Sequence, residues 1–150
     1  MSNVDDFSRD LAENLKAIDE ARSALLAQVR ALSPEDLRRV RRGGWSVHEV
    51  LRHVIDSEVA YTKVVGFLRS KPADLPNASG DDVASGAAAA EALERVRQSM
   101  ISLLDDIDES TFYDLRALGK EQYSVVSVLE NVASHDHEHL EQISKTLSAH

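Results

Sequence analysis

The chain has 150 residues, a net charge of −9, six histidines and no cysteine. The lack of cysteine excludes disulfides, thiolate metal ligands and a cysteine nucleophile. The excess of 26 acidic over 17 basic residues argues against nucleic acids and anionic membrane surfaces as partners, because binding them requires basic residues that neutralise phosphates.

The length predicts a single domain, residues 1–150, that is large enough to bury a hydrophobic core. No apolar stretch approaches the roughly 18 residues that a membrane-spanning helix requires. Residues 1–6 lack the basic and then apolar layout of a signal peptide. We therefore expect a cytoplasmic protein.

Apolar residues recur at three- and four-residue spacing in four segments, which is the pattern of one helix face. The segments predict helices over residues 5–32, 46–70, 87–107 and 125–147. The second helix has the clearest start, because Ser46 and Glu49 form an S-x-x-E capping box. Pro72 disfavours helix at the residue before it, so this helix should end near Ser70.

The connections are predicted to be polar. We expect a short turn at 33–37, a long loop over 71–86 and a polar segment over 108–122. No segment of useful length shows the alternation of apolar and polar residues that is typical of a strand. The chain therefore reads as all-α, a four-helix bundle. The loops after the second and third helices are long enough for crossovers, so up-and-down order is not assured.

The histidines of the fourth helix suggest a metal site. His135 and His139 are four residues apart, which places their side chains about 40° apart on one helix face. They lie at the edge of the apolar stripe, as His53 does on the second helix. The three side chains can therefore converge inside the bundle, where metal sites are commonly built. An H-x-x-x-H pair also arises by chance, and His53 alone is compatible with a buried, hydrogen-bonded histidine.

Three imidazoles would leave open positions on a bound zinc ion, which is typical of catalytic rather than structural sites. Nickel, manganese and iron accept the same ligands, so the residues do not select the metal. Two further side chains are candidates to support the ligands. Glu58 lies on the apolar stripe of the second helix, where it either orients a ligand or reaches solvent or an arginine. Gln142 lies one turn beyond His139.

The remaining candidate residues are not expected to bind the metal ion. His48, His137 and His150 are expected to lie away from the site, and Asp136 is expected to be solvated. Trp45 is expected to pack as a hydrophobic staple at the start of the second helix.

Two segments carry a family resemblance. Residues 44–53 match the pattern W-S-x-x-E-x-L-x-H, and residues 135–143 match H-D-x-x-H-x-x-Q-I. In these motifs, in their order and in their separation, the chain resembles the DinB/YfiT-like superfamily of metal-binding four-helix bundles.

The resemblance implies a function as well as a fold. It places three metal ligands on His53, His135 and His139, and it implies a divalent ion, usually zinc or nickel, and often a homodimer. Characterised relatives include S-transferases that use the low-molecular-weight thiols bacillithiol or mycothiol, and a maleylpyruvate isomerase. We therefore expect a metal-dependent enzyme that activates a small thiol cosubstrate or water, and alternatively a non-catalytic metal-binding stress-response protein.

Overall fold

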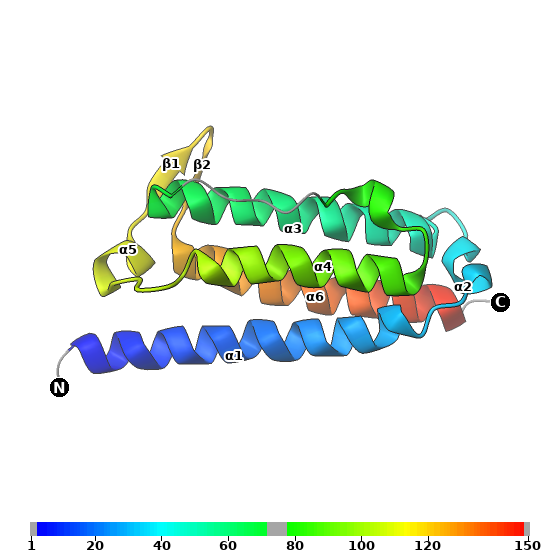
Figure 1. Ribbon diagram of the computed structural model, residues 1–150, viewed down its shortest axis with the longest axis horizontal. Helices are drawn as coiled ribbons and strands as arrows, with labels where there is room; N and C mark the ends of the chain where they lie inside the picture. The colour runs from blue at the N-terminus through cyan, green and yellow to red at the C-terminus, as the bar shows by residue number, and fades with distance from the viewer. Residues whose placement is uncertain (1–2, 72–77, 149–150) are drawn as a thin grey trace.

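Four long helices dominate the part of the chain that the structure, a computed structural model, describes, namely residues 3–71 and 78–148 (Figure 1). They are α1 (Asn3–Arg30), α3 (Val47–Arg69), α4 (Gly86–Ser102) and α6 (Val125–Ser148). The prediction of an all-α four-helix bundle is confirmed. Among the described residues, no helix is both long and apolar enough to cross a membrane.

Local side-chain contacts explain where α3 begins and ends. The hydroxyl of Ser46 accepts from the backbone N–H of Glu49 at 3.1 Å, and the Glu49 carboxylate accepts from the backbone N–H of Ser46 at 3.3 Å. This reciprocal capping box satisfies two of the backbone donors that a helix start leaves free. At the other end Ser70 has a left-handed backbone, with φ at 52°, which ends the helix.

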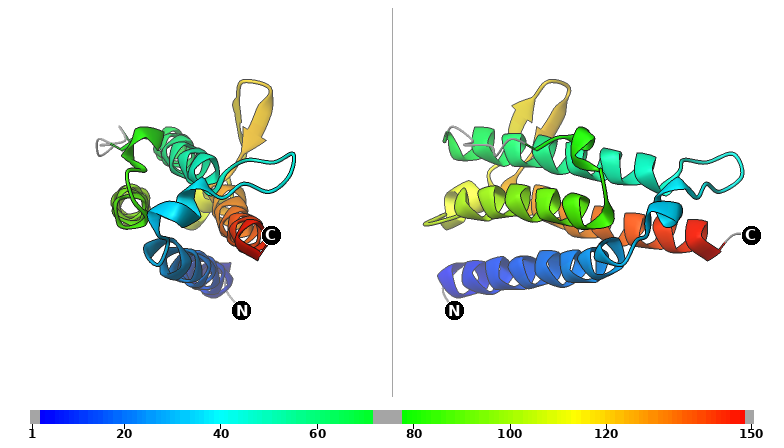
Figure 2. Two further views of the ribbon diagram at one scale, coloured as in Figure 1. Left: turned by 90° about the vertical axis from the view of Figure 1, so that its right-hand side faces the viewer. Right: turned by 45° about the vertical axis from the view of Figure 1, so that its right-hand side comes forward.

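The helices do not follow up-and-down order. α3 and α4 run in the same direction, opposite to α1 and α6 (Figure 1), so the connection between α3 and α4 must return along the bundle. The end-on view of Figure 2 shows α1 opposite α3 and α4 opposite α6. α3 therefore lies beside α6 and antiparallel to it, although the two helices are far apart in sequence. Part of the long loop predicted over 71–86 lies outside the described residues.

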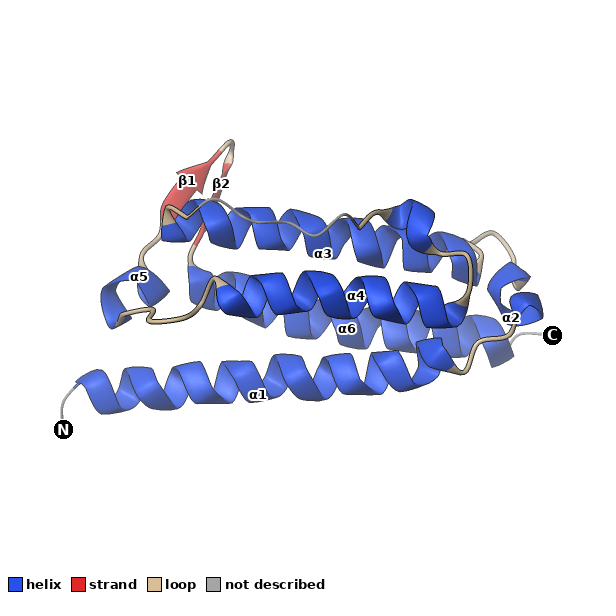
Figure 3. Cartoon of the chain, in the orientation of Figure 1, coloured by secondary structure: helices blue, strands red, loops and turns tan. Residues whose placement is uncertain are grey.

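The structure adds short elements that the sequence pattern did not predict. They are a 3₁₀ turn (Gly80–Asp82), α5 (Glu109–Tyr113) and an antiparallel hairpin of β1 (Arg116–Leu118) and β2 (Glu121–Tyr123) (Figure 3). The turn predicted over 33–37 forms the short helix α2 (Pro34–Arg38), with Ser33 as its N-cap. The polar connection predicted over 108–122 therefore contains α5 and most of a short hairpin, which the sequence pattern did not indicate. Each strand has three residues, too few to show an alternating pattern, while Gly119 at the turn has φ of 67°. α4 also ends five residues earlier than predicted.

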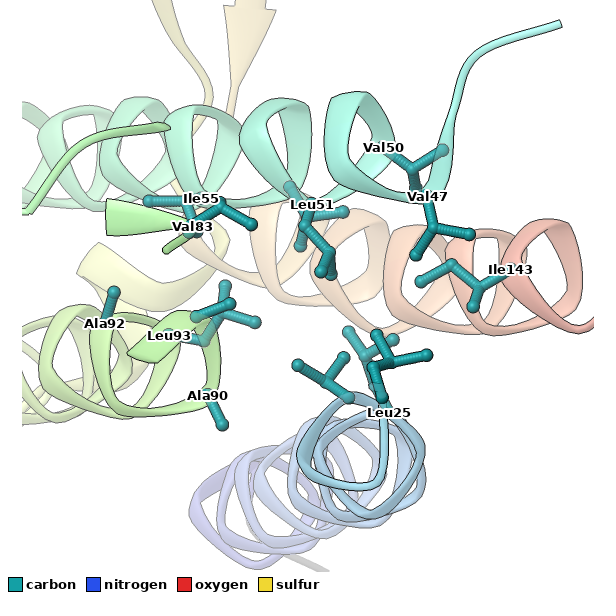
Figure 4. Close-up of a cluster of buried hydrophobic side chains, with 14 of the residues drawn as sticks. Leu25, Val47, Val50, Leu51, Ile55, Val83, Ala90, Ala92, Leu93 and Ile143 are labelled. Carbon is teal, nitrogen blue, oxygen red and sulfur yellow. The ribbon is translucent and has the colours of Figure 1, made fainter. Parts of the chain in front are cut away.

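The core consists of two apolar clusters, one toward each end of the bundle. Figure 4 shows one of them, in which Leu25, Leu51, Leu93 and Ile143 come from the four long helices. On each of those helices one buried charged residue separates the two clusters. These residues are Arg22, Glu58, Arg97 and Asp136.

Candidate metal centre

The three candidate histidines come from the two antiparallel helices α3 and α6. His53 lies two turns into α3, and His135 and His139 occupy successive turns of α6. One ring nitrogen of each residue lies within 4.8 Å of the others. The structure therefore brings together the three side chains that the spacing and the resemblance singled out.

The rings are close enough to share one ion. The Nε2 atoms of His135 and His139 are 2.9 Å apart, and the ring of His53 lies 5.4 Å and 5.1 Å from theirs between centroids. Two nitrogen ligands at about 2.1 Å from one ion lie roughly 3 Å apart when the angle between them is near 90°. The spacing of His135 and His139 fits that geometry, so the donor set suits a divalent cation.

Burial favours the neutral form that metal binding requires. His139 is buried, and the other two histidines are half-buried. Burial lowers the pKa of His135, and the neighbouring His139 and His53 lower it further. Burial also lowers the pKa of His139, against the opposing effect of its hydrogen bond to Gln142. Neutral imidazoles offer a lone pair to an ion at neutral pH.

Gln142 determines which nitrogen of His139 faces the other rings. Nδ1 of His139 lies 2.9 Å from Oε1 of Gln142, so Nδ1 is the protonated nitrogen when the amide oxygen accepts. Nε2 is then left with its lone pair, pointing toward His135. A hydrogen bond of this kind commonly orients a metal-binding histidine.

Glu58 does not orient a histidine in the described hydrogen-bond network. Its carboxylate instead accepts from Nε of Arg97 at 2.6 Å and from Nη2 of Arg22 at 2.9 Å. The expectation that Glu58 contacts a ligand is therefore corrected, and the alternative of an arginine partner is the one observed. Burial alone would raise the pKa of Glu58, but the charges of Arg22 and Arg97 hold it below its usual range.

Two aromatic rings flank the histidines. Trp45 is 46% exposed, and its ring lies edge-on to His53 at 5.3 Å between centroids. Trp45 therefore packs against His53 with part of its ring exposed, and its role as a hydrophobic staple stays a prediction. The ring of Tyr61 lies 5.7 Å from the ring of His135 between centroids. Oγ of Ser57 lies 3.4 Å from Nε2 of His53. On α3, Ser57 and Tyr61 follow His53 at intervals of four residues, a spacing that could have identified them.

Asp136 is the residue that sequence reasoning misplaced most clearly. It was expected to be solvated, but it is 2% exposed and bound to Arg22 and Arg97. A sequence signal existed, because Asp136 lies four residues after Val132 and therefore on the apolar stripe of α6. Arg22 lies in the same way four residues after Ile18.

The other histidines that the structure describes lie apart from the site. His137 is exposed on the far side of α6, and Nε2 of His48 lies 3.0 Å from the carbonyl oxygen of Val83. His150 lies outside the described residues.

The family model of the DinB superfamily matches residues 17–143. The chain belongs to the DinB superfamily. A solved structure, the crystal structure of TT2238, a four-helix bundle protein, is similar to this DinB chain with a TM-score of 0.67 at 23% identity, covering 89% of this chain and 98% of that one. At this identity the likeness supports the fold alone. Among curated proteins, no match to this DinB chain was found.

Proposed function

We propose that this DinB chain binds a divalent metal ion on His53, His135 and His139 and uses it to activate a small thiol or water. Zinc and nickel are the first candidates for this ion. Manganese and iron suit the same ligands. One observation carries the proposal. Glu58 and Gln142, the two side chains that were candidates to support the ligands, would also be the candidates for a fourth ligand, but Glu58 binds two arginines and Gln142 binds the Nδ1 side of His139.

Open coordination is the chemical consequence of that arrangement. Three imidazoles without a fourth protein ligand are the donor set of catalytic rather than structural zinc sites. A divalent ion there acts as a Lewis acid that lowers the pKa of a thiol or water molecule bound to it. The chain contains no cysteine, so any thiol must come from a cosubstrate, and S-transfer to an electrophile is the reaction that fits.

The side chains around the histidines have separable roles in this proposal. Trp45 beside His53 and Tyr61 beside His135 offer apolar ring surface against which a substrate can pack. Burial and the nearby Glu58 raise the pKa of Tyr61, so its hydroxyl keeps its proton and can donate a hydrogen bond. Ser57 offers a second hydroxyl beside His53.

A second candidate is a metal-binding protein without catalytic activity. One observation favours it, namely that the side chains seen against the histidines, Trp45, Ser57, Tyr61 and Gln142, include no group that titrates near neutral pH. A general base is therefore not evident. A metal ion that binds a thiol and lowers its pKa makes the thiolate available without a general base.

Elemental analysis tests the metal site directly. The protein should be purified without a histidine tag and compared with the variants His139→Ala and His137→Ala. We expect about one metal ion per chain in the wild type and in His137→Ala, and loss of that metal in His139→Ala. Substoichiometric metal in the wild type, unchanged by His139→Ala, would falsify both candidate functions.

A reaction screen then separates the two candidates. The metal-loaded protein is incubated with low-molecular-weight thiols and with electrophiles such as epoxides and unsaturated acids, and the products are identified by mass spectrometry. Turnover that requires metal and disappears in His139→Ala supports the enzyme. Stoichiometric metal without turnover supports the binding protein. We also propose that the chain forms a homodimer, as the resemblance implies, and analytical ultracentrifugation of the same samples tests this.

A further inference from the structure

The layer between the two apolar clusters contains four ionised side chains, one from each long helix. Arg22 of α1, Glu58 of α3, Arg97 of α4 and Asp136 of α6 are 4%, 3%, 5% and 2% exposed. Two positive and two negative groups balance one another. We call these four residues the ionic layer.

Each carboxylate of the ionic layer binds both arginines. Asp136 accepts from Nε and Nη2 of Arg22 at 3.0 and 2.9 Å, and from Nη2 of Arg97 at 3.1 Å. Glu58 accepts from Nε and Nη2 of Arg97 at 2.6 and 3.3 Å, and from Nη2 of Arg22 at 2.9 Å. The guanidinium group is a planar fork, so these bonds fix the direction of each side chain as well as its distance.

The arginines also tie α1 and α4 to each other. Nη1 of Arg22, on α1, donates to the carbonyl oxygen of Leu93 on α4 at 3.3 Å. Nη1 of Arg97, on α4, donates to the carbonyl oxygen of Ile18 on α1 at 3.2 Å. The arginines are therefore held by two helices, and α3 and α6 attach to this frame through one carboxylate each.

The ionic layer lies beside the histidine site along both helices. Asp136 directly follows His135, and Glu58 directly follows Ser57, whose hydroxyl faces His53. A helix with side chains has a radius of about 5–6 Å, so a rotation of about 10° moves a side-chain tip by roughly 1 Å. Metal ligands must be placed to within about 0.2 Å. Apolar packing alone tolerates such a rotation better than directional hydrogen bonds do.

We propose that the ionic layer sets the rotation of α3 and α6 against each other and thereby pre-forms the three-histidine site. Glu58 and Asp136 are positioning residues in this proposal. They bind no metal, but they hold the helices that present His53, His135 and His139. The inference rests on the proposed metal function, since it concerns the affinity of that site.

If the ionic layer only stabilised the fold, a different result would be expected when its charges are removed. Replacing a buried ion network by apolar residues of similar volume is often neutral or stabilising, because the cost of desolvating the charges is removed. A fourfold apolar variant therefore separates the two roles. It keeps the packed volume and removes the directional bonds.

The test compares the wild type with the variant Arg22→Met, Glu58→Leu, Arg97→Met, Asp136→Leu. Circular dichroism and urea unfolding report the fold, competition with a chromophoric chelator gives the zinc Kd, and the visible spectrum of the cobalt-substituted protein reports ligand geometry. We expect a folded variant with a zinc Kd raised about 10- to 100-fold and an altered cobalt spectrum. A folded variant with the wild-type Kd and spectrum overturns the proposal.

A second variant covers the case in which the fourfold variant does not fold. Glu58→Gln keeps the shape of the side chain and removes one charge, and we expect at least about a tenfold rise in zinc Kd. An unchanged Kd in folded Glu58→Gln overturns the proposal. Failure of both variants to fold assigns the ionic layer to folding and overturns it as well.

Thr62→Val is the matched control. Thr62 is fully buried on α3, and its hydroxyl donates only to the carbonyl oxygen of Glu58 in its own helix at 2.8 Å. This substitution should leave the zinc Kd within about twofold of the wild type, because the hydrogen bond that it removes lies within one helix and does not join two helices. The wild type separates the two proposals. If it binds no metal, the proposed function fails, whereas equal binding by wild type and variants overturns only the role of the ionic layer.

Discussion

Nδ1 of His139 and Oε1 of Gln142 lie 2.9 Å apart, on successive turns of α6. The amide accepts from the ring, so the ring can neither rotate freely nor present Nδ1 to an ion. Nε2 of His139 is thereby aimed at Nε2 of His135. One neutral side chain thus selects the tautomer of the most buried histidine of the site.

Gln142→Leu should weaken metal binding and have little effect on the fold. We expect the zinc Kd to rise about 10- to 100-fold, the effect usual for a residue that orients a metal ligand, while the apoprotein unfolds at nearly the same urea concentration. Competition with a chromophoric chelator measures the Kd. Glu141→Gln on the exposed side of α6 is the control, and equal Kd values for the two variants would show that the hydrogen bond has no role in binding.

The single tryptophan should report occupancy of the site. Trp45 is the only tryptophan of the chain, and its ring contacts the ring of His53. Nickel or cobalt at His53 should therefore quench the emission of Trp45 in a saturable manner at one ion per chain. The same titration of His53→Ala should show no saturable phase, and a saturable phase that persists there would place the bound ion elsewhere.

Much of this arrangement followed from local sequence. The capping box at Ser46 predicted the start of α3, and the four-residue spacing of His135 and His139 predicted that they share a helix face. Both are properties of a single helix. The resemblance then indicated that His53 belongs with them, which helical periodicity alone could not establish.

The unpredicted features depend on how four helices are rotated against one another. Asp136 and Arg22 lie on apolar stripes, a position that signals burial, but their pairing requires α1 and α6 to face each other in a particular register. The contact of Trp45 with His53 likewise depends on the path of the chain between α2 and α3. Sequence periodicity describes one helix at a time, so it predicts neither of these contacts between segments.

Acid should destabilise the protein through Glu58. Its pKa is lower in the folded state than the usual value of about 4.3 in an unfolded chain, because the charges of Arg22 and Arg97 outweigh the effect of burial. This contribution to the free energy of unfolding is fully present above pH 4.3 and is lost as the pH falls through the folded pKa. At pH 7, Glu58→Gln should lower that free energy by about 3–5 kcal/mol.

Urea unfolding of the metal-free protein between pH 7 and pH 3 measures this effect. The difference in stability between wild type and Glu58→Gln should shrink as the pH falls below about 4.3. All other titrating groups are common to the two proteins, so the comparison isolates Glu58. A difference that stays constant over the whole range would contradict the assigned pKa shift.

Gly86 should be intolerant of any side chain. It opens α4 where that helix meets the last turn of α1, and a Cβ atom there would clash with the carbonyl oxygen of Val29 and lie 3.1 Å from that of Leu32. Gly86→Ala should destabilise the protein by about 1–3 kcal/mol, as overpacking does. At Gly44 the nearest atom to an added Cβ is at an ordinary 3.4 Å, so Gly44→Ala should unfold at nearly the wild-type urea concentration.

The two helices that carry the histidines are separated in the chain by α4, α5 and the hairpin. Because synthesis proceeds from the N-terminus, His53 leaves the ribosome well before His135 and His139. A nascent chain therefore contains one of the three candidate ligands until α6 has been synthesised. The complete site therefore forms only when α6 has docked against α3, and an ion bound to all three histidines would stabilise the docked helices against unfolding.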